Sequence, residues 1–130
     1  MILTITMNPS VDRTIVVDEL RRGEVLRATA VRVDPGGKGI NVARALAANG
    51  VKTRAVVAVG GAEGEHLTSL LGLAGVDLVP VPIAGSTRSN ITVVEPDGTT
   101  TKLNEPGAHL SAGTGISVGT RSSRIRSRRR

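Results

Sequence analysis

The sequence predicts an α/β protein whose body of helices and parallel strands carries a small β-sheet lid. First, strand-like and helix-like segments alternate between residues 33 and 81, an order typical of parallel sheets with crossover helices. Second, alternating segments at 90–95 and 99–104 flank an Asp-Gly pair, which is a strong hairpin signal. Third, a run of glycines between residues 35 and 39 joins a strand-like segment to a helix-like one. Together these features indicate one α/β domain, or a piece of one, with a separate β layer.

The expected strands are short segments rich in β-branched or aliphatic residues. Residues 53–59 form a continuous apolar run, which is typical of a buried parallel strand. The other candidates are shorter or alternate between polar and apolar residues, and they lie at 2–6, 13–18, 25–33 and 76–81. The lid is expected to contain the strands near 13–33 and 89–104, and to exclude water from the ligand end of the body.

Two helices are expected. The first covers 40–49 and ends before Gly50, where a left-handed residue is favoured. Because Arg44 is its only charged residue, most of its circumference is expected to be buried. The second helix covers 63–73, and its inner face is formed by Leu67, Leu70 and Leu71.

The glycine run at 35–39 predicts a site for an anion or a polyhydroxylated ligand. A glycine-rich helix start presents backbone N–H groups to a ligand, and Lys38 adds a cation. The alternative is a tight turn with an exposed lysine. A nucleotide-binding P-loop is excluded, because Arg32 stands where that motif needs a glycine and Gly39 where it needs a hydroxyl. No nucleophile motif accompanies the two histidines, His66 and His109.

Composition excludes several classes of function. The chain has no cysteine, so disulfides, thiolate metal sites and cysteine nucleophiles are excluded. It has no aromatic residue on which nucleic-acid bases would stack. No apolar run reaches the roughly 20 residues that cross a bilayer, and the start MILTITMNPS lacks a secretion signal. A cytoplasmic protein without membrane contact is therefore expected.

The net charge of +6 is confined to one end of the chain. Residues 1–120 hold 11 basic and 11 acidic side chains, whereas residues 121–130 hold the other six arginines. A neutral body presents no basic binding face, so no specific nucleic-acid partner is expected. Residues 112–130 are rich in Gly, Ser, Thr and Arg and contain no acidic residue, which predicts an unstructured tail outside the domain.

Four segments resemble the PfkB, or ribokinase-like, carbohydrate kinases. They are TMNPSVDRTI at 6–15, DPGGKGINVARALAANG at 34–50, VGGAEGEHLTSLL at 59–71 and TRSNITVVEPDGTTTKLNEPG at 87–107. Their combination is most similar to the bacterial 1-phosphofructokinase and tagatose-6-phosphate kinase branch. The resemblance covers residues 1–111 and implies the amino-terminal part of a ribokinase-like, Rossmann-type three-layer body with a β lid.

The resemblance implies a binding site for a phosphorylated sugar, fructose 1-phosphate or similar. Asp12 matches the acidic residue that holds sugar hydroxyls, although by itself it is a turn or cap residue. Gly36, Gly37 and Asn41 match the loop and first helical turn that contact the sugar. Lys38 matches the lysine of this branch, for which the resemblance implies contact with phosphate.

Three further residues match substrate-binding positions of the family. Arg27 and Arg88 match basic residues that bind the sugar phosphate, a use that suits the guanidinium fork. Without the family, both are solvated charges at strand edges. Asn90 lies beside Arg88 and is expected to reach the sugar. Glu105 belongs to the NEPG signature of the branch, but the resemblance implies no role for it.

The sequence departs from the family where catalysis is expected. In the family, the aspartate of a G-A-G-D motif near the carboxyl end acts as general base, and its glycine amides stabilise the transferred charge. This chain contains no such motif and no acidic residue after Glu105. No catalytic, cofactor-binding or metal-binding residue is therefore expected in this chain. The family uses ATP and Mg²⁺, and both are expected to bind this chain poorly.

The leading hypothesis is a truncated sugar-phosphate kinase with little or no turnover. Its parent reaction phosphorylates fructose 1-phosphate or a related phosphosugar with ATP, and a reading-frame change near residue 112 is one explanation of the truncation. The alternatives are a non-catalytic sugar-phosphate-binding or regulatory domain and, as the weakest, an arginine-tailed nucleic-acid-binding protein. An open apolar sheet edge predicts dependence on a partner, for which a homodimer through the β lid is one candidate.

Overall fold

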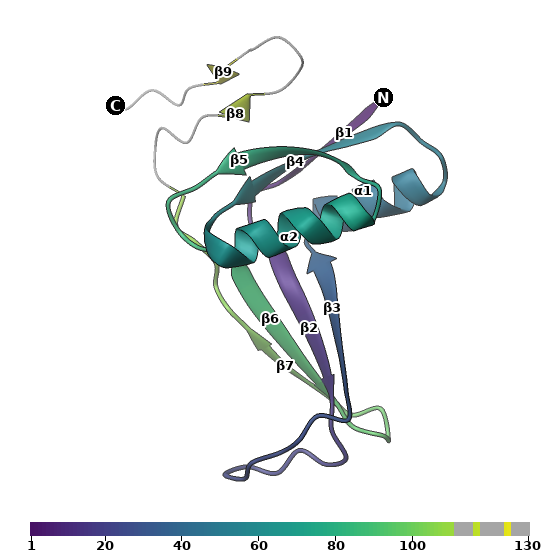
Figure 1. Ribbon diagram of the computed structural model, residues 1–130, viewed down its shortest axis with the longest axis vertical. Coiled ribbons are helices and arrows are strands. Elements are labelled where there is room, and N and C mark those ends of the chain that lie inside the picture. The colour runs from purple at the N-terminus through teal and green to yellow at the C-terminus, as the bar shows by residue number, and fades with distance from the viewer. Residues whose placement is uncertain (111–115, 118–123, 126–130) are drawn as a thin grey trace.

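The computed structural model describes residues 1–110, 116–117 and 124–125. A helix-covered parallel sheet forms the body at one end of the molecule, and a four-stranded sheet, the lid, extends from it (Figure 1). Because the chain passes between body and lid several times, segments far apart in the sequence meet where the two sheets join.

The body sheet consists of three parallel strands in the order β1-β4-β5. Strand β1 spans Ile2–Thr6, β4 spans Thr53–Val59 and β5 spans Asp77–Pro82. All three lie where the sequence predicts strands, to within a residue at each end. The central strand β4 is mostly buried, as its continuous apolar run predicts.

Helices α1, Lys38–Ala48, and α2, Gly61–Leu73, pack on one face of this sheet (Figure 1). The core between helices and sheet is aliphatic, and Ala55 and Val57 of β4 face helix residues Ile40, Ala43, Leu67 and Leu71. Val42 is 51% exposed, so α1 buries one face and not most of its circumference as predicted. Neither helix, within the residues described, is long and apolar enough to cross a bilayer.

The opposite face of the body sheet carries no helix in the described part of the chain. The register of β1 with β4 places Leu3 and Ile5 on that face, where they are 39% and 54% exposed. The described residues thus comprise one helical layer and the sheet layer of the predicted three-layer body, together with the predicted lid.

The lid is a four-stranded sheet in the order β3-β2-β6-β7. Its strands are β2 (Ser10–Val16), β3 (Ala30–Gly36), β6 (Arg88–Val94) and β7 (Thr100–Asn104). Strands β6 and β7 form the hairpin predicted from the Asp-Gly pair. Strand β2 pairs antiparallel with β3 and parallel with β6, so it is a central strand of the lid.

Strand β2 begins earlier than predicted, at Ser10 rather than Arg13, and ends at Val16 rather than Asp18. The Asn-Pro-Ser sequence indicates a break in the chain, but the break ends before Ser10, because Ser10 pairs with both neighbouring strands. Pairing between distant strands therefore overrides the local turn signal.

Strand β3 covers residues 30–36, and the prediction of a strand over 25–33 is wrong for its first half. Residues 25–29 alternate in polarity, but they have no strand beside them because the ladder with β2 ends at Val16 and Ala30. The strand instead continues through Pro35 to Gly36, which is possible because β3 lies at the sheet edge. Residues 17–29 form the connection at the far end of the lid (Figure 1).

Two short strands, β8 at Ile116–Ser117 and β9 at Arg124–Ile125, pair antiparallel. These four residues differ from the prediction of an unstructured tail over 112–130. The other residues to which that prediction applies lie outside the described part of the chain.

Candidate functional site

The predicted site residues other than Arg27 gather where the lid joins the body. Strand β3 ends at Gly36, Gly37 precedes helix α1, and Lys38 is the first helical residue. Gly37 has a φ of 128°, a conformation that residues with a Cβ rarely adopt, so the turn from strand to helix requires glycine. Ser10 pairs with Gly36 on one side and Arg88 on the other, so three lid strands meet the body at the same level.

Asp12 lies against Gly36 with one carboxylate oxygen held by a hydrogen bond. Ser10 Oγ donates a hydrogen bond of 2.7 Å to Asp12 Oδ1. A Cβ on Gly36 would overlap Asp12 Oδ2 and Ser10 Oγ, so glycine at this position leaves the room that the carboxylate occupies. The half-buried carboxylate is thus oriented by the protein, and it can accept hydrogen bonds from the hydroxyl groups of a ligand.

Strand pairing extends the polar surface around Asp12 across the whole lid. Asp12 pairs with Asp34 and Asn90, and Asn90 pairs with Asn104, so these four residues form one row on one face of the lid. The next row on the same face consists of two threonines between two cations: Arg32, Thr14, Thr92 and Lys102. This face presents the hydrogen-bonding groups that a polyhydroxylated, anionic ligand requires.

Asn90 and Arg88 each have a buried polar atom without a hydrogen-bond partner in the described part of the chain. The atoms are Asn90 Oδ1 and Arg88 Nε. An unpaired buried polar group costs about 1–3 kcal/mol, so both atoms are candidates to bind a ligand. The two amino groups of Arg88 donate to the carbonyl oxygens of Glu105, at 3.4 Å, and Asn8, at 3.2 Å. These two backbone carbonyl oxygens therefore hold the guanidinium where the lid joins the body.

Helix α1 begins with an amino terminus that favours an anion. No side chain caps this helix at Gly37, and its first turn contains no acidic residue. Lys38 and Asn41 lie in that turn, and both are exposed. The backbone N–H of Asn41 already donates to Gly37 O within the helix, so the Asn41 side chain is its remaining group for a ligand.

Arg27 lies away from the other predicted site residues. It belongs to the connection 17–29 at the far end of the lid, where it is exposed and lines a small depression with Asp18 and Glu19 (Figure 1). Val16, where β2 ends, is roughly 13 Å beyond Asp12 at the usual rise of a strand. The fold of one chain thus brings the other predicted residues together but does not bring Arg27 to them.

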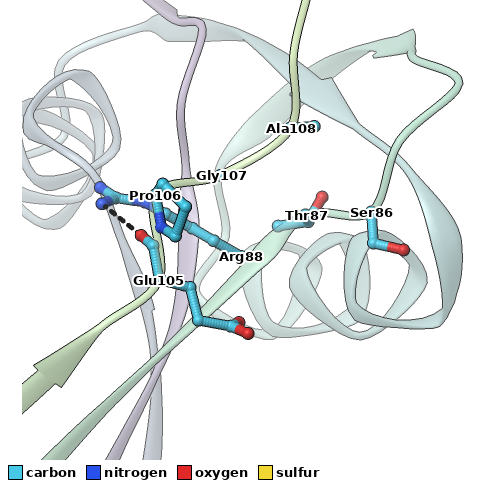
Figure 2. Close-up of a pocket in the computed structure, with 7 residues that line it drawn as sticks. All are labelled: Ser86, Thr87, Arg88, Glu105, Pro106, Gly107 and Ala108. Carbon is cyan, nitrogen blue, oxygen red and sulfur yellow. Dashed lines mark hydrogen bonds between the residues drawn. The ribbon is translucent and has the colours of Figure 1, made fainter.

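A shallow pocket of about 280 Å³ opens beside Arg88 (Figure 2). It is lined by the start of β6 and the segment after β7: Ser86, Thr87, Arg88, Glu105, Pro106, Gly107 and Ala108. Figure 2 shows the Arg88 guanidinium turned toward the carbonyl oxygen of Glu105, while the Glu105 carboxylate points elsewhere. Of the predicted site residues, Arg88 lines this pocket and Asp12 does not.

Sequence reasoning missed the part played by Ser10. Residues two apart on a strand share a face, so the spacing of Ser10 and Asp12 contained the signal. A strand that begins at Arg13, as predicted, places both residues outside the sheet and conceals it. Glu105 was noted in the sequence without a role, and its contacts across the junction become visible only when β6 and β7 are paired.

Residues 5–115 match the model of the pfkB family carbohydrate kinases, and the chain belongs to that family. The match covers the four segments on which the resemblance was recognised. The family assignment and the α/β fold with its lid are thereby confirmed.

Individual relatives match most of this chain. It is 49% identical to the ATP-dependent 6-phosphofructokinase isozyme 2 of Mycobacterium tuberculosis over 94 residues, which are 72% of this chain and 28% of the relative. It is 40% identical to the 1-phosphofructokinase of Xanthomonas campestris over 109 residues, which are 83% of this chain and 34% of the relative.

A solved structure agrees with the fold. The crystal structure of phosphofructokinase-2 from Escherichia coli in complex with fructose-6-phosphate aligns with a TM-score of 0.81 and 38% identity. The alignment covers 87% of this chain and 38% of that chain. The present chain thus spans about a third of the length of the relatives it matches.

Proposed function

We propose that this chain forms the sugar-phosphate half of a PfkB-type kinase site, with fructose 1-phosphate or a close relative as ligand. The observation that carries the proposal is the Asp12 carboxylate, oriented by Ser10 and seated against Gly36. It lies in one row with the amide oxygen of Asn90, which has no hydrogen-bond partner among the described residues. The family match and the relatives named as phosphofructokinases support this ligand class.

In this proposal the sugar ring lies between the polar face of the lid and the start of helix α1. Asp12 accepts hydrogen bonds from sugar hydroxyls, and Asn90 Oδ1 accepts another. Gly36 and Gly37 carry no side chain, so the ring approaches the backbone closely. Asn41 reaches a hydroxyl from the first helical turn.

The phosphate is recognised by Arg88 and Lys38. The Arg88 guanidinium carries two held amino groups and an Nε–H without a partner in the described part of the chain, and this N–H donates to a phosphate oxygen. Lys38 adds charge at the amino terminus of α1, where the helix dipole also favours an anion. Arg27 has no part in the site of a single chain, because it lies at the far end of the lid.

The described residues do not fit a site for ATP with Mg²⁺. Among them, no group of three His, Cys, Asp or Glu side chains is placed to hold a metal ion. Gly39 follows Lys38, where a P-loop has the hydroxyl residue that binds the metal. We propose that these 130 residues bind the phosphosugar without turnover.

Calorimetric titration of the 130-residue chain tests the binding proposal. Fructose 1-phosphate and fructose 6-phosphate are expected to bind, and unphosphorylated fructose to bind at least about tenfold more weakly, a difference of about 1.4 kcal/mol. Asp12→Ala is expected to abolish binding, whereas Asp18→Ala, an exposed aspartate at the far end of the lid, is the matched control. Equal affinity for fructose and its phosphates would contradict the proposed role of Arg88 and Lys38.

A coupled ATP assay on the same chain tests the proposed lack of turnover. Each candidate phosphosugar is supplied with ATP and Mg²⁺, and no ADP formation above background is expected. Turnover that disappears in Asp12→Ala would show that the 130 residues include a complete active site.

We also propose that two copies of the chain associate through the face of the lid opposite Asp12. Strand alternation places Val31 and Leu103 on that face, where they are 60% and 62% exposed. Their half-buried neighbours on the same face are Ile15, Ile91 and Val93, whereas Val33 packs against the core of the body. An exposed apolar sheet face is stabilised when it is covered, and a second copy supplies a matching face about a two-fold axis.

A further inference from the structure

We propose that Glu105 is a positioning residue for phosphate recognition, which acts by holding the guanidinium of Arg88. The inference rests on the proposed function, because it deepens the role of Arg88 in the same site. It assigns a task to the acidic residue of the NEPG segment, which neither the sequence nor the family resemblance explains.

Glu105 makes two different hydrogen bonds to the start of β6. Its Oε1 accepts a bond of 2.6 Å from the backbone N–H of Ser89, and its carbonyl oxygen accepts one of 3.4 Å from Arg88 Nη1. The carboxylate bond continues the ladder between β6 and β7 past its last pair, Asn90 with Asn104. The backbone of Glu105 is thereby anchored beside β6, and its carbonyl oxygen is kept facing Arg88 (Figure 2).

Glu105 supports Arg88 without neutralising its charge. Its carboxylate is engaged by Ser89, and in the described part of the chain no carboxylate lies within ion-pair distance of the Arg88 guanidinium. A carbonyl oxygen orients a guanidinium but carries no formal charge. Arg88 thus keeps its charge for a phosphate, together with an Nε–H that has no partner among the described residues, and phosphate suits a guanidinium fork well.

Asn8 holds the second amino group of the Arg88 guanidinium. Arg88 Nη2 donates to Asn8 O at 3.2 Å, and Asn8 Nδ2 donates to Pro106 O, also at 3.2 Å. The loop before β2 and the segment after β7 are therefore tied to each other and to Arg88. With both amino groups held, the guanidinium has little rotational freedom to lose when a phosphate binds. Without the Glu105 carboxylate, the backbone of Glu105 is no longer anchored to Ser89, and its carbonyl oxygen no longer holds Arg88 Nη1 in place.

The test compares affinities of the full 130-residue chain for fructose 1-phosphate and fructose 6-phosphate by calorimetry. Glu105→Ala is expected to weaken binding about tenfold, which corresponds to about 1.4 kcal/mol. Glu105→Gln keeps an acceptor for the Ser89 N–H, so its affinity is expected to stay within about twofold of wild type. The matched control is Glu95→Ala, because Glu95 Oε1 accepts the Leu20 N–H at 2.8 Å at the far end of the lid, and this change is expected to leave the affinity unaltered.

A double variant shows whether Glu105 acts by positioning Arg88 or contributes to phosphosugar binding independently of Arg88. If Glu105 acts through Arg88, Glu105→Ala adds no further loss of affinity in the Arg88→Ala background. Losses that add in the double variant, or wild-type affinity in Glu105→Ala, would overturn the proposal. Should Glu105→Ala fail to fold, Glu105→Asp replaces it: its shorter side chain does not reach Ser89 from the same backbone position, and wild-type affinity in a folded Glu105→Asp protein would equally overturn the proposal.

Phosphosugar binding by the wild-type chain distinguishes a failure of the proposed function from a failure of the proposed role of Glu105. A wild-type chain that binds neither phosphosugar refutes the proposed function, and this inference with it. A wild-type chain that binds and loses affinity in Arg88→Ala, but not in Glu105→Ala, refutes this inference alone.

Discussion

Arg13 on strand β2 and Glu63 in the first turn of helix α2 form a two-bonded ion pair that ties the lid to the body. Arg13 Nη2 lies 3.0 Å from Glu63 Oε1, and Arg13 Nη1 donates to Glu63 Oε2 at 3.2 Å. Arg13 Nη1 also donates to Ser89 Oγ on β6. Because Arg13 follows Asp12 on the strand, it lies on the other face of the lid and connects lid and body outside the proposed site.

Breaking this pair is expected to loosen the lid. The two side chains are 28% and 32% exposed, so Glu63→Gln is expected to lower the free energy of unfolding by only about 0.5–1 kcal/mol. Hydrogen exchange of the amides in β2 and β6 is expected to accelerate. Asp77→Asn is the control, because it breaks the Arg54–Asp77 pair of 2.9 Å within the body and is expected to leave lid exchange unchanged. Similar lid exchange in both variants would contradict a tie between lid and body.

Gly36→Ala is expected to damage the proposed sugar site directly. The new Cβ overlaps Asp12 Oδ2 and Ser10 Oγ, and overpacking of this kind costs about 1–3 kcal/mol. Because the carboxylate must move, affinity for fructose phosphates is expected to fall about tenfold or more in a calorimetric titration. Gly72→Ala is the matched control, since a Cβ there meets no atom within 4 Å, and its melting temperature is expected to rise slightly. Wild-type affinity in Gly36→Ala would refute the seating of Asp12 against Gly36.

The hairpin between β6 and β7 is expected to respond to pH through Asp97. The backbone N–H of Thr99 donates to Asp97 Oδ1 at 2.9 Å, and this bond holds the pKa of Asp97 below its ordinary value of 3.8. Because the pKa is lower in the folded than in the unfolded chain, the bond stabilises the hairpin above pH 3.8 and this contribution is lost as the pH falls through the folded pKa.

An NMR titration of the Thr99 amide measures this effect. Its chemical shift is expected to change with a midpoint below 3.8. In Asp97→Asn, which keeps an acceptor oxygen but has no proton to gain, the shift is expected to be flat over the same range. A midpoint at or above the ordinary value would contradict the stabilising bond.

Association of two copies is expected to depend on the exposed apolar residues on the face of the lid opposite Asp12. Leu103→Lys places a charge at a position that is 62% exposed in the single chain and covered in the proposed dimer. Sedimentation of this variant is expected to show a monomer at concentrations where the wild type is a dimer. The control is Val25→Lys, which changes an apolar residue that is 89% exposed in the connection 17–29. A monomeric wild-type chain, or a dimeric Leu103→Lys variant, would argue against this interface.

Most elements of the fold could be predicted because their signals are local. The apolar run of β4 specifies a strand, the Asp-Gly pair at 97–98 specifies a hairpin, and the glycine at position 50 specifies a helix end, each from a few adjacent residues. The first half of the predicted strand at 25–33 was wrong because alternation alone does not provide a partner strand, and β2 ends at Val16.

The sequence suggests which residues form the candidate site, and this stays a prediction, but it does not indicate how they are arranged. Family resemblance selected Asp12, Asn90 and Arg88, yet nothing local indicates that β2 pairs with β6 so that Asp12 stands beside Asn90. The part played by Ser10 depends on the same register, and the part of Glu105 on the pairing of β6 with β7.

The sequence by itself determined both helices, the body strands, the hairpin between β6 and β7, and the glycine-rich start of a helix. Tertiary structure alone decided that Asp12 is seated against Gly36, that Arg88 is held by Asn8 and Glu105, and that Arg27 lies at the far end of the lid. The physical reason is that backbone propensities act over a few neighbouring residues. Register between distant strands follows from which pairing buries the apolar residues and satisfies the backbone groups of the whole sheet.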